Sequence, residues 1–173
     1  MHTQRVPVAP GVDLAVDTWQ PATARADEVS FLLVHGLASN ARMWDGVACE
    51  LSDRGHVAVT VDLRGHGRSS KPDGPYDMAT VADDLAAVIR SLGLERPVVA
   101  GQSWGGNVVL ELGWRHPAAV RGIICVDGGI IELADWFPSW EACVAALTPP
   151  RLDHLTPAEL GRASCRERVS YHV

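Results

Sequence analysis

The sequence has no pair of cysteines with the spacing C-x-x-C, and its four cysteines are widely scattered. This scatter favours neither a zinc site nor a disulfide framework, because both are recognised by regular cysteine spacings. Cys49 and Cys125 lie within apolar patterns, which predicts that both are buried, reduced thiols. We therefore expect no metal site.

Long apolar runs are missing as well. No stretch of about 18 apolar residues occurs, and the first residues, MHTQRVPVAPG, contain no apolar signal core. The formal net charge is -6, with 15 Lys and Arg against 21 Asp and Glu. Such an acidic balance argues against a nucleic-acid partner. We expect a soluble, cytoplasmic protein with neither a nucleic-acid nor a membrane partner.

The chain has 173 residues, 47% of them hydrophobic, which is enough for one domain with a real core. Short apolar runs alternate with helical patterns that begin at Asn40, at Asp77 and after Ser103. The predicted strands cover residues 12–19, 29–34, 56–61, 97–100 and 121–126. The first of these suits an antiparallel strand. The alternation predicts an α/β fold, in which a mostly parallel sheet carries helices on both faces.

One serine stands among glycines where a predicted strand gives way to a predicted helix. The segment Gly101 to Gly106 reads GQSWGG, and its first five residues fit the pattern G-x-S-x-G. In that pattern the serine lies in a sharp, strained turn that exposes its hydroxyl, and the glycines avoid collisions. The pattern predicts that Ser103 is a catalytic nucleophile.

A nucleophilic serine needs nearby N–H groups that bind the oxyanion. One is expected from the residue after the serine, Trp104, and one from an earlier strand-to-helix loop. The segment HGLAS at residues 35–39 follows an earlier predicted strand, so Leu37 is the second candidate donor. Gly36 is a candidate substrate contact. We expect His35 to hold this loop by hydrogen bonding rather than to act as a base.

Three segments together resemble the α/β-hydrolase fold superfamily: HG at residues 35–36, DLRGHGRS at 62–69 and GQSWGG at 101–106. The resemblance covers about residues 5–130 and is nearest to the small esterase, haloperoxidase-like and dehalogenase-like branch. It implies a Ser-acid-His triad that acts on a small acyl substrate without a metal or cofactor. It also implies structural roles for Arg64 and His66. Serine at position 103 differs from the carboxylate nucleophile of dehalogenases and epoxide hydrolases.

The triad acid in this fold follows the nucleophile along the chain. Asp127 closes the predicted strand 121–126, at the sheet edge where open α/β sheets bind ligands. It is the candidate acid. The alternatives are that Asp127 caps the turn before Gly128, or that the acid follows a later strand.

The triad base should be a histidine beyond the acid. His116 lies too far along the helix that follows Ser103, His154 lies among prolines, and His172 lies in the tail. We therefore predict that the base is absent and that the chain is an N-terminal fragment, truncated before the last strands of the sheet. Truncation would leave the last predicted strand as an exposed apolar edge.

Residues 130–160 follow a different pattern, aromatic and interrupted by prolines. We interpret them as the start of a lid-like segment, with Trp136 and Trp140 as candidate substrate contacts; a surface helix is the alternative. Residues 161–173 begin GRASCRERV, which resembles the translated end of a sequencing adapter. We expect 161–173 to be a non-native tail and 1–160 to be a partial hydrolase domain.

The sequence therefore predicts a serine-dependent hydrolase of small esters or related acyl compounds, inactive in this fragment because the base is missing. Two alternatives remain open. The protein could be a hydrolase-like receptor that binds a small ligand, or a truncated product without function. The pattern does not predict an oligomeric state.

Overall fold

The computed structural model of the chain describes residues 1–23, 25–130, 136–148 and 156. The chain divides into two compact units, Met1–Ile131 and Glu132–Val173, and each is described by itself. The predicted tail 161–173 lies outside the described residues. No helix in the described ranges combines the length and apolarity needed to cross a membrane.

The first unit holds a six-stranded sheet. Its strands are β1 (His2–Ala9), β2 (Val12–Trp19), β3 (Ser30–Val34), β4 (Val57–Val61), β5 (Val98–Gln102) and β6 (Gly122–Val126). Its helices are η1 (Ala41–Trp44), α1 (Asp45–Asp53), α2 (Met78–Ser91), α3 (Trp104–Arg115) and η2 (Pro117–Ala119), and α4 (Trp140–Leu147) lies in the second unit.

The strand order is β1-β2-β4-β3-β5-β6. Strands β4, β3, β5 and β6 run parallel, whereas β2 pairs antiparallel with both β1 and β4. The predicted mostly parallel sheet is therefore confirmed, including the antiparallel strand 12–19. Strand β1 was not predicted from the sequence.

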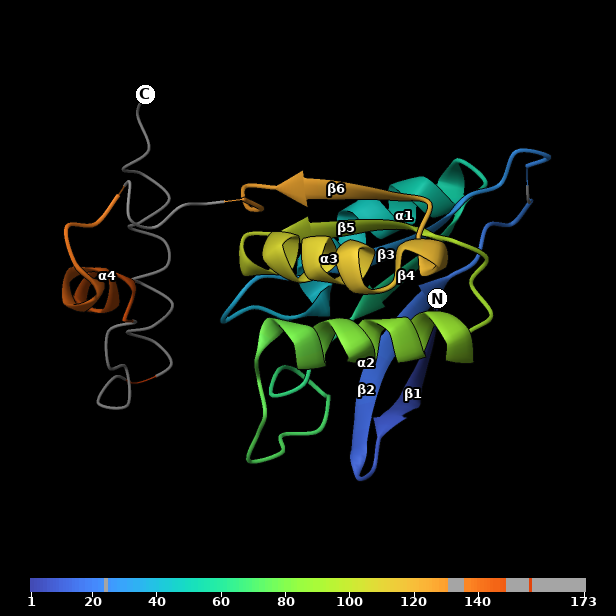
Figure 1. Cartoon of the computed structure of the whole chain (residues 1–173). Helices are drawn as coiled ribbons and strands as arrows, with labels where there is room; N and C mark the ends of the chain where they lie inside the picture. Colours follow the sequence, from blue (N-terminus) through green and yellow to red (C-terminus); the bar gives the residue numbers. More distant parts are fainter. Residues whose placement is uncertain (24, 131–135, 149–155, 157–173) are drawn as a thin grey trace. The chain divides into compact units, whose positions relative to one another are not determined.

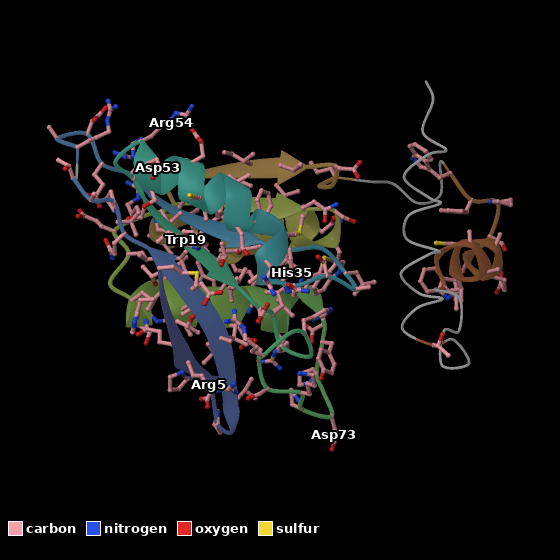
Figure 2. The ribbon with its side chains drawn as sticks, turned by 180° about the vertical axis from the view of Figure 1, so that it is seen from behind. Arg5, Trp19, His35, Asp53, Arg54 and Asp73 are labelled. Atoms are coloured by element: carbon pink, nitrogen blue, oxygen red, sulfur yellow. The ribbon has the colours of Figure 1, made fainter. Side chains whose placement is uncertain are left out.

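Helices cover both faces of this sheet, as predicted. In Figure 1, α2 and α3 lie in front of the strands, and Figure 2, from behind, shows α1 across the opposite face. Strand β3 supplies both sides of the core, because alternate side chains point to opposite faces. Leu32 and Val34 join the apolar cluster shared with α2 and α3, and Leu33 packs with Trp44 and Ala48 on the other face.

The predicted starts of two helical segments are also confirmed. The side chain of Asn40 accepts a hydrogen bond from Arg42 N at 3.1 Å, at the start of η1. The carboxylate of Asp77 accepts one from Thr80 N at 2.9 Å and caps α2. Side-chain oxygens at this position satisfy backbone N–H groups that have no partner within the helix.

Strand β6 forms an exposed edge of the described sheet. Ile123, Ile124 and Val126 are all at least 36% exposed, which agrees with the expected apolar edge. The prediction that Cys49 and Cys125 are buried is wrong, since both are exposed. Cys125 lies on this uncovered strand, and Cys49 lies on the outer side of α1, next to the buried Ala48.

Candidate active site

The loops that follow β3, β5 and β6 meet at one edge of the sheet. These strands run parallel, so their carboxyl ends lie together. The loops comprise residues 35–40, the turn at Ser103, and residues 127–129. In open α/β sheets this edge is where ligands bind.

Ser103 occupies a strained turn between β5 and α3. Its φ is 52° and its ψ is -123°, a backbone conformation that residues other than glycine rarely adopt. A Cβ atom at Gly101 would collide with the backbone of Gly105, which explains the glycine there. The backbone N–H of Ser103 donates to Val126 O at 2.9 Å, so the turn is tied to β6. The turn has the backbone that G-x-S-x-G predicts.

The other two loops touch this turn through their own glycines. A Cβ atom at Gly36 would lie 2.5 Å from Gln102 Oε1 and 3.1 Å from Ser103 Cβ. A Cβ atom at Gly128 would collide with the carbonyl of Ser103. The structure therefore brings the predicted contact Gly36 and the loop that begins with Asp127 against the serine.

The two predicted oxyanion donors belong to segments beside Ser103. Trp104 is the first residue of α3, so its N–H has no acceptor within the helix, and the helix dipole adds positive potential there. Leu37 follows Gly36 and is 61% exposed. The roles of both N–H groups as oxyanion donors stay predictions.

His35 is wholly buried and both of its ring nitrogens contact backbone. Leu63 N donates to Nε2 at 3.0 Å, so Nδ1 carries the proton and donates to Gly36 O at 2.7 Å. Burial lowers the pKa of His35, because desolvation disfavours the charged imidazolium. His35 therefore holds the loop, as expected, and has no free nitrogen with which to take a proton from Ser103.

Acidification from about pH 7.5 to about pH 5 should lower the free energy of unfolding through His35. Because its folded pKa is lowered from 6.5, the unfolded chain takes up the proton first. The stability contribution is complete above about 6.5 and is lost as pH falls through the folded pKa. Urea unfolding across this range measures the slope. We expect His35→Gln to flatten it; an unchanged slope in His35→Gln contradicts the assignment.

Asp127, the candidate acid, follows β6 with a φ of 49° and is exposed. Its loop is fixed by Asn107, whose Oδ1 accepts from Gly129 N at 3.4 Å. The contact of Asn107 was not predicted, because a single polar residue within an apolar helical pattern gives no specific signal. The position of Asp127 is compatible with either predicted role.

The other predicted residues lie elsewhere. His116 ends α3 at the far side from Ser103, and its Nε2 contacts Asp83 Oδ1 at 2.7 Å. Trp136 and Trp140 belong to the second unit and are 75% and 68% exposed. Their role in a lid stays a prediction. His154 and His172 lie outside the described residues.

The DLRGHGRS loop contributes structural contacts, as the resemblance implied. Arg64 forms a buried, bidentate ion pair with Asp84 of α2, with distances of 2.6 and 2.7 Å. His66 Nδ1 donates to Arg64 O at 2.9 Å, and the His66 ring centroid lies 5.0 Å from that of His35. The ring contact places this loop beside His35 at the start of the loop at residues 35–40.

Comparisons with known proteins support the same fold. A sequence model of the family described as alpha/beta hydrolase fold matches residues 29–147. The chain is 34% identical over 96 residues to a 2-(acetamidomethylene)succinate hydrolase of Mesorhizobium japonicum, covering 56% of this chain and 34% of that protein. It is 35% identical over 103 residues to a fluoroacetate dehalogenase of a Burkholderia species, covering 57% and 34%.

A solved structure of an esterase from Thermogutta terrifontis has a TM-score of 0.64 and 29% identity, covering 74% of this chain and 46% of that one. Against several curated relatives, the chain spans only 29% to 34% of their full length. The family match nevertheless extends over more than half of the 173 residues. The chain belongs to the alpha/beta hydrolase fold family.

Proposed function

We propose that this chain is the N-terminal part of a longer serine hydrolase that cleaves small esters or related acyl compounds. The observation that carries the proposal is the strained turn at Ser103, against which the loops of Gly36 and Gly128 pack. The resemblance associates serine at this turn with acyl transfer, whereas dehalogenases and epoxide hydrolases of the same fold attack through a carboxylate. The serine at position 103 therefore favours an ester hydrolase over a dehalogenase or an epoxide hydrolase.

In the proposed reaction Ser103 Oγ attacks the substrate carbonyl carbon, and a histidine of the longer protein, absent from this chain, takes the hydroxyl proton. Asp127 orients that histidine. The backbone N–H groups of Leu37 and Trp104 donate to the oxyanion that forms. Collapse of this intermediate expels the alcohol, which receives the proton from the histidine. Water then attacks the acyl-enzyme by the same route and releases the acid and free Ser103.

The substrate is proposed to be apolar near its acyl group. Gly36 would contact it at the sheet edge, and Trp136 and Trp140 are proposed as further substrate contacts. Aromatic side chains with a few polar groups are usual in pockets for small ligands.

A fluorophosphonate probe tests the proposal, because it reacts only with an activated serine. The folded, complete protein should gain one adduct, and mass spectrometry should place it on the peptide that contains Ser103. Heat-denatured protein serves as the control and should not react. No adduct, or an adduct on another serine, contradicts the proposed function.

A further inference from the structure

The loop that carries Leu37 is held at both ends by residues that follow β4. At its start, His35 joins Gly36 O to Leu63 N. At its end, Asp62 Oδ1 accepts a hydrogen bond from Ala41 N at 2.7 Å, and both residues are almost fully buried. Asp62 and Leu63, which directly follow β4, therefore hold the loop at its two ends.

The Asp62 carboxylate is itself fixed. Its second oxygen accepts from Arg68 N at 3.0 Å and from Arg68 Nε at 3.1 Å. Arg68 also binds Asp17 on β2, at 2.6 Å. Although burial alone would raise the pKa of Asp17, hydrogen bonds from Arg68 and Thr3 bring it below the ordinary value. The carboxylate that faces Ala41 is thus held by a partly buried network.

The loop between these two clamps contains a strained residue. Ala38 has a φ of 57°, a conformation that persists only where the surroundings enforce it. Ala41 begins η1 behind its cap, Asn40, so its N–H would otherwise lack an acceptor. Removing the Asp62 contact would release the loop three residues after this strained residue, and Leu37 directly precedes the strained residue.

We propose that Asp62 is a positioning residue, which fixes the Leu37 N–H for oxyanion binding by anchoring Ala41. This inference rests on the proposed function, since it assigns Leu37 as an oxyanion donor. Asp62 touches no substrate; it acts through the backbone of residues 37–41. A donor that is displaced by about 1 Å costs up to about 10²-fold in rate, and the cost falls on the transition state.

Two variants of the complete protein test this role. In Asp62→Asn, the side-chain NH₂ group replaces one of the two carboxylate oxygens, so the hydrogen bond from Ala41 N or those from Arg68 are lost. Ala41→Pro removes the N–H alone, and proline suits the first helical position after Asn40, whose φ of -156° and ψ of 175° are extended. For both we expect kcat on p-nitrophenyl acetate to fall by about 10²-fold with little change in KM. Amide exchange at Ala41, whose N–H donates to Asp62, should accelerate in Asp62→Asn.

Asp83→Asn is the matched control, because it makes the same chemical change at an ion pair outside this network and leaves the Asp62 contact with Ala41 intact. It should change neither kcat nor the exchange at Ala41. If Asp83→Asn lowers kcat as much as Asp62→Asn, or if Asp62→Asn changes neither kcat nor exchange, the inference is overturned. A wild-type protein without esterase activity or probe adduct instead overturns the proposed function, while the exchange data still report whether Asp62 holds the loop.

Discussion

We expect the Ser103→Ala variant of the complete protein to hydrolyse p-nitrophenyl acetate with a kcat about 10⁶-fold below that of the wild type. In the proposed reaction the Ser103 hydroxyl forms the covalent bond with the substrate, and alanine has no group that replaces it. Alanine keeps the Cβ atom that already fits the turn against Gly36, so the fold should be unchanged. Steady-state kinetics and a thermal melt of the same preparation measure the two effects.

The control for this experiment is Ser91→Ala, at the exposed end of α2. It should retain the wild-type kcat, which separates the loss of the nucleophile from the loss of any serine. A Ser103→Ala variant that stays within about tenfold of the wild type contradicts the assigned nucleophile, because removal of such a residue leaves only binding and the oxyanion donors.

The second large effect concerns stability. Asp84→Asn should lower the free energy of unfolding by about 3–5 kcal/mol, because it leaves the Arg64 guanidinium buried without its partner. The side chains of Arg64 and Asp84 are only 4% and 3% exposed, and the ion pair is bidentate. Urea unfolding of this chain measures the change.

The preceding residue supplies a matched control. Asp83 pairs with Arg115 at 2.9 Å, but these side chains are 48% and 33% exposed, and solvent screens the pair. Asp83→Asn should therefore cost only about 0–1 kcal/mol. Equal losses in the two variants would show that burial does not set the value of the Arg64–Asp84 pair.

The parallel strands and the serine turn could be predicted because their signals are local. Apolar runs mark buried strands, and G-x-S-x-G specifies a backbone that few sequences tolerate. Strand β1 carries no such signal: HTQR is polar, Val6 is its one fully buried residue, and pairing with β2 through the turn at Gly11 stabilises it. Tertiary pairing, rather than local preference, places this strand in the sheet.

The contacts that support the site were harder to predict. Asp62 binds Ala41, and Asn107 binds Gly129, through side-chain to backbone hydrogen bonds across 21 and 22 residues. Such bonds leave no periodic pattern in the sequence. The wrong assignment of Cys125 has a related cause, because an apolar run predicts a strand but not whether another strand covers it.

The close approach of Gly36 and Gly128 to Ser103 separates chemistry from selectivity. Where backbone packs on backbone, no side chain can enlarge or reshape the floor of the site. Under the proposed function, selectivity among substrates then depends on side chains that project from these loops, such as the exposed Leu37. Substitution of these side chains can therefore change selectivity while the backbone around Ser103 keeps its position.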